Sequence, residues 1–167
     1  QYVARPIVGP SISVVFILLA GLGAALFFGQ TNNAMIVIVA TCLGAYMALN
    51  IGANDVANNM GPAVGANALT MGGAIAIAVV FESAGALLAG GDVVSTIAKG
   101  IIAPESMGDS ATFIWAMMSA LLSAALWVNL ATYVGAPVST THSVVGGVMG
   151  AGIAAAGFAA VSWDTMG

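Results

Sequence analysis

The sequence predicts an all-α integral membrane protein, built from polytopic helices that include a re-entrant helical hairpin. Only 8 of the 167 residues are Asp, Glu, Lys or Arg, and 60% are hydrophobic. A soluble domain carries about 25% charged residues. The apolar runs approach the ~20 residues that a helix needs to cross a bilayer. A long uncharged stretch near the C-terminal end predicts the hairpin.

Residues 1–33 are expected to form an N-terminal segment with an additional transmembrane helix. The apolar run 12–28 follows Gly9-Pro10-Ser11 and ends in a polar turn at 29–33. No basic region with a small-residue cleavage site is visible, so we expect no signal peptide. Because the chain starts at Gln1 rather than Met, we expect it to be a piece of a longer protein.

The next segments are predicted to be two membrane-crossing helices. Residues 34–70 form the first, with Gly61-Pro62 expected to break it near its end. Residues 71–91 form the second, with Glu82 near the midpoint. Residues 92–103 alternate apolar side chains with Asp92 and Lys99 at a helical period, which predicts an interfacial amphipathic helix.

The stretch 110–163 contains 54 residues and no Asp, Glu, Lys or Arg. As one helix it would be about 80 Å long, which exceeds the ~30 Å hydrocarbon core, so the chain must reverse. The strong breaker is Gly135-Ala136-Pro137, and no charge accompanies it. We therefore expect a re-entrant hairpin over 111–157 that turns inside the protein at membrane depth. A surface turn between two full spans is the alternative.

The first candidate site is a cluster of one carboxylate and four amides in ten residues. Its members are Asn50, Asn54, Asp55, Asn58 and Asn59. A charge within a membrane-length apolar run costs about 2.5–3.5 kcal/mol unless it faces protein, water or an ion. If the flanking Gly52 and Gly61-Pro62 unwind the helix, free carbonyls would join these side chains as oxygen ligands for a sodium-type cation. The alternative is helix capping at the interface.

The second candidate site is Pro137-Val138-Ser139-Thr140-Thr141-His142-Ser143. Proline at a first helical position marks a helix start. Free N–H groups, the positive end of the helix dipole and consecutive hydroxyls then favour an anion without any arginine. A capped helix start with nothing bound is the alternative, and His142 by itself is more typical of a packed, hydrogen-bonded residue.

Three further observations limit the chemistry. Glu82 in mid-span either titrates, binds a cation or stays a neutral structural acid. The chain has two basic residues, Arg5 and Lys99, which excludes a nucleic-acid footprint. Cys42 is expected to be a small buried hydrophobic residue. No His/Cys metal cluster and no phosphate loop with a lysine is present, so we expect no cofactor and no metal beyond Na+ near Asp55.

An anion site beside cation ligands indicates an ion-coupled anion carrier, and the motifs resemble those of the inorganic phosphate transporter (PiT) family. Gly52-Ala53-Asn54-Asp55-Val56-Ala57-Asn58 is similar to its signature, and Pro137-Val138-Ser139-Thr140-Thr141-His142 to its hairpin motif. Phe81-Glu82-Ser83-Ala84-Gly85 and Thr96-Ile97-Ala98-Lys99-Gly100 resemble segments between those two. The resemblance covers about residues 34–157. Asn59 departs from it, because the family usually has a small residue there.

The resemblance implies one half of an inverted-repeat transporter, with residues 34–167 as the repeat and phosphate between two halves near the midplane. It also implies roles for seven residues. Phosphate would bind Asn54, Asp55, Asn58, Ser139, Thr140 and Thr141, and the co-ion, Na+ or H+, would bind Asp55, Asn54, Asn58 and Glu82. Each motif occurs once here, so we expect the partner to be a second repeat in a missing C-terminal half. A homodimer of oppositely oriented chains is the alternative.

We therefore expect a non-enzymatic, multi-pass protein of the cell membrane, of the bacterial inner-membrane kind, that forms the first half of a phosphate symporter. A sulfate permease of the same fold is the alternative, although Asp55 can accept a hydrogen bond from protonated phosphate and not from sulfate. A structural membrane subunit and an intramembrane hydrolase, using Ser139 or Ser143 with His142 and Asp55, are the remaining hypotheses.

Overall fold

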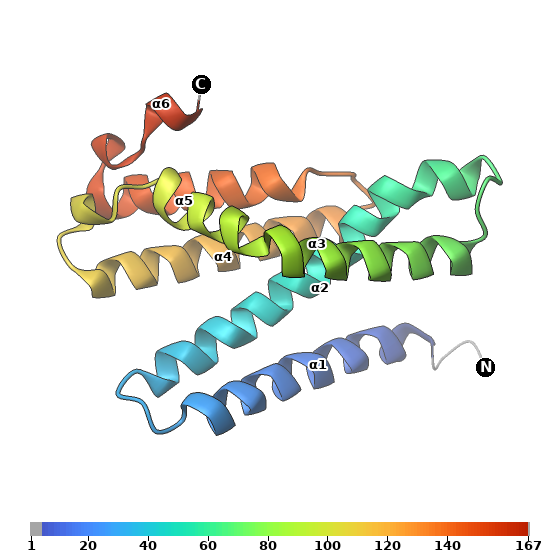
Figure 1. The fold of residues 1–167 in the computed structure, drawn as a ribbon, viewed down its shortest axis with the longest axis horizontal. Coiled ribbons are helices and arrows are strands. Elements are labelled where there is room, and N and C mark those ends of the chain that lie inside the picture. Colours follow the sequence, from blue (N-terminus) through green and yellow to red (C-terminus); the bar gives the residue numbers. More distant parts are fainter. Residues whose placement is uncertain (1–4, 167) are drawn as a thin grey trace. The chain divides into compact units, whose positions relative to one another are not determined.

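A computed structural model describes residues 5–166, and its regular elements in that range are all helical (Figure 1). In chain order they are α1 (Arg5–Phe28), α2 (Ala34–Gly65), α3 (Met71–Gly100), η1 (Pro104–Met107), α4 (Ser110–Tyr133), α5 (Thr140–Ala156), η2 (Phe158–Ala160) and α6 (Trp163–Met166).

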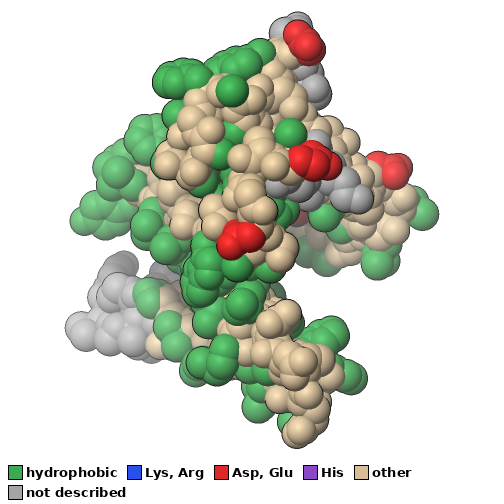
Figure 2. Space-filling model, turned by 90° about the vertical axis from the view of Figure 1, so that its left-hand side faces the viewer, with side chains coloured by type: hydrophobic (Ala, Val, Ile, Leu, Met, Phe, Trp, Pro, Cys, Tyr) green, Lys and Arg blue, Asp and Glu red, His purple; other side chains and the backbone are tan. Residues whose placement is uncertain are grey.

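Four of these helices are long and apolar enough to cross a membrane. They contain the candidate spans Val8–Phe28, Ala34–Gly65, Met71–Ile97 and Ser110–Tyr133. Large hydrophobic side chains are exposed on these helices, and Leu87 and Leu88 of α3 are 88% and 86% exposed. Figure 2 shows many hydrophobic side chains at the surface in one view. Burying such surface requires lipid or further protein. The chain is thus a multi-pass, all-α membrane protein, as the composition predicts.

The described chain divides into two compact units, with the boundary between Asn50 and Ile51 inside α2. In the first unit, α1 and the start of α2 approach closely at Gly21. A Cβ atom on Gly21 would lie 2.7 Å from Cys42 Sγ, and this thiol lies 3.9 Å from the carbonyl oxygen of Ile17. Cys42 is part-buried and free, which agrees with a packing role.

The core of the second unit lies around the antiparallel pair α4 and α5, which forms the expected helical hairpin. Ile102 is fully buried, and the side chain of Ile102 occupies the space that a Cβ on Gly152 of α5 would need. The chain after α5 returns to the end of α3 through a bridge between Ile102 and Val161. At the turn between the two helices, Gly135 has a φ of +72°, which glycine adopts without steric cost.

Two helix breaks that the sequence predicts are contradicted by the structure. Helix α2 continues through Gly61-Pro62 to Gly65, so the helix does not unwind beside Asp55. Pro62 lies in the last turn of α2, where its ring removes one hydrogen bond, that to the carbonyl of Asn58. Its fixed φ still suits a helix, and the chain leaves the helix within four residues.

The second contradicted prediction is the helix break before the segment 92–103. Helix α3 runs without interruption from Met71 to Gly100, so no separate helix begins at Asp92. Gly90 and Gly91 are poor helix formers, but both keep their N–H groups and neither has the ring clash of proline. The segment 92–100 is therefore the last part of α3.

Candidate functional site

The two sequence motifs meet at a single hydrogen bond between α2 and α5. Thr140 Oγ1 donates to Asp55 Oδ2 over 2.7 Å, although the two residues are 85 positions apart in the chain. Thr140 is buried and Asp55 is half-buried. A hydrogen bond to a carboxylate is about twice as strong as one between neutral groups. This bond therefore fixes the acid of the first motif against the helix start of the second.

Asparagines one turn apart on α2 extend this contact toward the hairpin turn. Asn58 Nδ2 donates to Asn54 Oδ1 over 2.9 Å and to the carbonyl oxygen of Val138 over 3.3 Å. Asn54 is buried, and its Nδ2 donates to Thr132 Oγ1 over 3.2 Å. Two amides of the predicted cluster, Asn54 and Asn58, are thus joined side by side on α2. Thr132 was missed, because a lone hydroxyl in an apolar helix gives no sequence signal.

A pocket of about 350 Å³ lies between this part of α2 and the hairpin turn. Its lining consists of small and polar residues: Ala53, Asn54, Ala57, Asn58, Thr132, Gly135, Ala136 and Pro137. Small side chains leave room for an ion or a few waters, and the amides and the hydroxyl supply polar partners.

The start of α5 has the features of an anion site. Ser139 is the N-cap residue, and its Oγ accepts a hydrogen bond from the backbone N–H of His142 over 3.2 Å. The N–H groups of Thr140 and Thr141 precede the first intrahelical bond, which runs from Ser143 N–H to the Ser139 carbonyl over 3.0 Å. Unpartnered N–H groups and the helix dipole attract negative charge. Ser139 and Thr141 are both exposed, so an anion can reach them.

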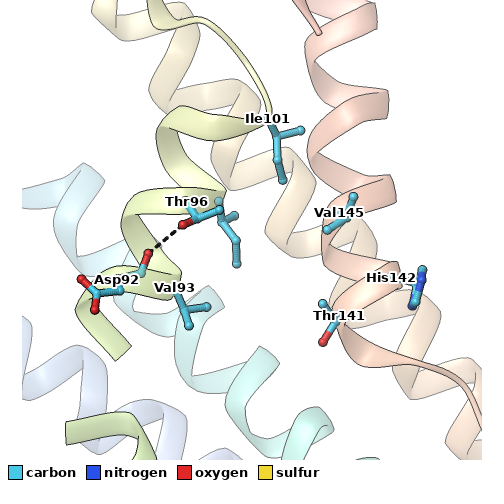
Figure 3. A pocket seen from close by; sticks show the side chains of 8 residues that line it. Asp92, Val93, Thr96, Ile101, Thr141, His142 and Val145 are labelled. Carbon is cyan, nitrogen blue, oxygen red and sulfur yellow. Dashed lines mark hydrogen bonds between the residues drawn. The ribbon is translucent and has the colours of Figure 1, made fainter. Parts of the chain in front are cut away.

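The exposed side of the α5 start borders a second pocket, of about 580 Å³, opposite the C-terminal part of α3. Figure 3 shows Asp92, Val93 and Thr96 on α3 across from Thr141 and Val145 on α5. Thr96 Oγ1 donates to the Asp92 carbonyl oxygen over 3.0 Å. Asp92 was expected only as the polar face of an amphipathic helix, so its place beside the second motif is a finding of the structure.

Three residues that the sequence analysis singled out do not join this site. Glu82 is exposed on α3 and lines neither of the two pockets described above. Asn59 is exposed, and it points about 100° around α2 from Asn58. Asn50 is buried in the other unit, where its Nδ2 donates to the Tyr46 carbonyl oxygen over 2.9 Å.

The donor set fits a hard cation better than a transition metal. Within residues 5–166, no group of three His, Cys, Asp or Glu side chains lies close enough to hold a metal ion. Asp55, the amide of Asn54 and the hydroxyl of Thr140 are oxygen donors, the kind that sodium-type cations use in transporters. The hydrolase alternative requires Asp55 to orient His142, but the Asp55 carboxylate bonds Thr140 instead.

Comparison with known proteins matches residues 51–167 to the Phosphate transporter family. A "Putative phosphate permease" of Helicobacter pylori (strain J99) is 56% identical over 154 residues, which cover 92% of this chain. A protein of the same name from Chlamydia trachomatis is 47% identical over 125 residues, or 74% of this chain. A solved structure titled "The sodium-dependent phosphate transporter" is 45% identical and matches 79% of this chain with a TM-score of 0.70.

The chain is much shorter than these relatives. It spans 29% of the length of both permeases and 33% of the length of the solved transporter.

Proposed function

The chain belongs to the phosphate transporter family, and from that premise we propose that it forms one half of a cation-coupled phosphate symporter of the cell membrane. The coupling ion is Na+ or H+, and the name of the structural relative favours Na+. The matched residues cover 29% of the Helicobacter pylori permease and 33% of the solved transporter. The remaining length supplies a second copy of the two motifs, with a homodimer as the alternative source.

The observation that carries the proposal is the bond between Thr140 and Asp55. It joins an anion-attracting helix start directly to a carboxylate. Once phosphate is bound at that helix start, its negative charge and the charge of the carboxylate would repel each other. Neither motif contains a Lys or Arg. A mobile cation beside Asp55 offsets this repulsion, because opposite charges a few ångströms apart attract strongly away from bulk water. Phosphate binding and cation binding therefore support each other.

Within this half-site, the residues divide by their chemistry. Ser139, Thr141 and the N–H groups of the first turn of α5 are donors and serve the phosphate oxygens. Asp55, Asn54 and Asn58 carry the oxygens that serve the cation. Thr140 lies between the two sets. Glu82, on the exposed face of α3, is proposed as a second acid on the coupling-ion path.

The test is uptake of labelled phosphate by the full-length transporter in proteoliposomes, with and without a Na+ gradient and with sulfate as competitor. We expect uptake that a Na+ gradient stimulates and that excess sulfate does not reduce. Asp55→Asn should lower uptake by about 100-fold or more without changing the amount inserted in the membrane. Asn59→Gln, in the same segment of α2, is the matched control and should retain uptake.

Other results would overturn specific parts of the proposal. Full uptake by Asp55→Asn would remove the cation site from Asp55. Strong competition by sulfate would change the substrate, and uptake driven by a pH gradient without Na+ would identify H+ as the coupling ion.

A further inference from the structure

The hydroxyl of Thr132 joins α4 to the buried amide of Asn54 on α2. Asn54 Nδ2 donates to Thr132 Oγ1 over 3.2 Å, and the same Oγ1 donates to the carbonyl oxygen of Val128 over 2.9 Å, one turn earlier in α4. A threonine hydroxyl has one proton, and the bond to Val128 uses it. Thr132 therefore meets Asn54 as an acceptor and receives the NH2 end of the amide rather than its oxygen.

The other end of the same amide is fixed in the same sense by Asn58. Asn58 Nδ2 donates to the carbonyl oxygen of Val138 over 3.3 Å, and a carbonyl oxygen can only accept. The same Nδ2 lies 2.9 Å from Asn54, so the atom of Asn54 that faces Asn58 has to be its oxygen. The backbone carbonyls of Val128 and Val138, one at each end, thus allow a single direction of donors and acceptors through the network.

The oxygen of Asn54 is the atom that a cation needs. An amide oxygen has two lone pairs, and the bond from Asn58 uses one of them. The second lone pair can serve a cation, whereas the NH2 end of the amide would repel one. Asn54, Asn58 and Thr132 all line the pocket of about 350 Å³ beside the hairpin turn. If Asn54 were turned over, its NH2 group would face the NH2 group of Asn58 and its oxygen would face α4.

We propose that Thr132 is a positioning residue for the coupling cation: by accepting the Nδ2–H of Asn54, its hydroxyl keeps the Asn54 oxygen turned toward the cation site. This inference rests on the proposed function, because it explains how one of the proposed cation ligands is held. It requires the affinity for Na+ to depend on the hydroxyl oxygen at position 132 and not on the volume of the side chain.

The test compares three substitutions of Thr132 in the full-length transporter, reconstituted in proteoliposomes. Thr132→Val keeps the shape and removes the hydroxyl, Thr132→Ala removes the hydroxyl and most of the volume, and Thr132→Ser keeps the hydroxyl and removes the methyl group. We would measure the Na+ concentration for half-maximal phosphate uptake and the maximal rate at saturating Na+.

The expected result follows the hydroxyl. Losing a partner that orients a metal ligand typically lowers metal affinity about 10- to 100-fold, so Thr132→Val and Thr132→Ala should each raise the half-maximal Na+ concentration by about tenfold or more. Thr132→Ser should stay close to the unmodified transporter. The maximal rates at saturating Na+ should be similar in all four proteins, because only the affinity for the cation changes.

Thr41→Val is the matched control. Thr41 Oγ1 donates to the carbonyl oxygen of Val37 over 2.7 Å, the same bond within a helix that Thr132 makes with Val128. Within residues 5–166, none of the hydrogen bonds of Asn54 involves Thr41. Thr41→Val should therefore lose the bond within its helix and keep the Na+ dependence of the unmodified transporter.

A second measurement does not require transport. A ligand that binds the folded protein raises its melting temperature in proportion to its occupancy, so we would titrate Na+ against the melting temperature of the purified transporter in detergent. Thr132→Val should need about tenfold more Na+ for the same rise, whatever its melting temperature without Na+.

An unchanged Na+ dependence in Thr132→Val would overturn the inference alone, and so would an equal shift in Thr41→Val. Shifts in Thr132→Ala and Thr132→Ser without one in Thr132→Val would assign Thr132 a packing role instead. If Na+ neither stimulates uptake by the unmodified transporter nor raises its melting temperature, the Na+ site of the proposed function fails first.

Discussion

Thr140 Oγ1 donates a 2.7 Å hydrogen bond to Asp55 Oδ2, and this bond uses the only proton of the hydroxyl. The hydroxyl therefore has lone pairs but no proton to offer a third group. A cation can use those lone pairs, whereas an unprotonated phosphate oxygen cannot. Under the proposed function, we therefore expect the Thr140 hydroxyl, which the family resemblance assigns to phosphate, to serve the cation.

Thr140→Val should therefore weaken the response to Na+ more than the binding of phosphate. The substitution keeps the shape of the side chain and removes the donor. Losing a hydrogen bond to a charged group costs about 1.5–3 kcal/mol, which corresponds to a roughly 10- to 150-fold change in an equilibrium constant. We expect the Na+ concentration for half-maximal uptake to rise at least tenfold, and by less than about threefold in Thr140→Ser.

Thr141→Val is the matched control for that experiment. It removes a neighbouring hydroxyl that lines the pocket facing α3 and that, within residues 5–166, forms no hydrogen bond with Asp55. It should raise the KM for phosphate and leave the Na+ dependence unchanged. If both valine variants shift the Na+ curve equally, Thr140 has no special relation to the cation.

Asn58 connects α2 to the turn of the hairpin, because its Nδ2 donates both to Asn54 Oδ1 and to the Val138 carbonyl. Asn58→Asp replaces this donor by a carboxylate that faces two acceptors. Unsatisfied or repelling polar groups cost about 1–3 kcal/mol. We expect a lower melting temperature of the purified transporter in detergent, together with reduced phosphate uptake.

Asn59→Asp makes the same chemical change one position along the helix. Asn59 is exposed and has no side-chain hydrogen bond within residues 5–166. Its melting temperature should stay close to that of the unmodified protein. Similar losses in the two variants would show that added charge on α2, rather than the broken contact, causes the instability.

The helical hairpin was predictable because its physical cause is a property of the sequence. A stretch of 54 residues without charge cannot extend as one helix through a bilayer, and Gly135-Ala136-Pro137 marks the reversal. The continuity of α2 through Gly61-Pro62 and of α3 through Gly90-Gly91 was not predictable from the same residues. In a membrane segment the backbone must satisfy its hydrogen bonds internally, which keeps a helix intact across weak helix formers.

The different contacts of the three consecutive hydroxyls also could not be predicted from the sequence. Neighbouring residues of a helix point about 100° apart, because a turn contains 3.6 residues. Ser139 caps the helix, Thr140 faces Asp55 on α2 and Thr141 lines the pocket with α3. Which hydroxyl meets which neighbour depends on how α5 is rotated, and that is set by packing with distant parts of the chain.

A pH-dependent prediction concerns the start of α4, outside the membrane-crossing segment. Hydrogen bonds from the Thr112 side chain and then from its backbone N–H hold the pKa of Asp109 below its ordinary value of 3.8. A carboxyl with a lowered pKa stabilises the fold above its unfolded-state pKa, and this stabilisation disappears as the pH falls through the folded-state pKa. Asp109→Asn keeps a capping side chain that does not titrate.

We therefore expect the difference in melting temperature between the unmodified protein and Asp109→Asn to be constant from about pH 5 to 8. Below about pH 4, the unmodified protein should lose stability relative to the variant. The comparison cancels the titration of the other acids. A difference that stays constant down to pH 2 would show that the cap at Asp109 does not depend on its charge.

Close packing of α4 against α5 leads to the last prediction, which uses two adjacent glycines. A Cβ atom on Gly147 would lie 2.7 Å from the Ala120 carbonyl oxygen and 3.3 Å from Ser123 Oγ, whereas a Cβ on Gly146 would meet nothing within 4 Å. Overpacking a helix contact costs about 1–3 kcal/mol, so Gly147→Ala should lower the melting temperature in detergent. Gly146→Ala should leave it unchanged or raise it, because alanine favours a helix over glycine by up to about 1 kcal/mol. Equal melting temperatures for the two variants would mean that the hairpin helices are not held at the distance that the backbone contact at Gly147 requires.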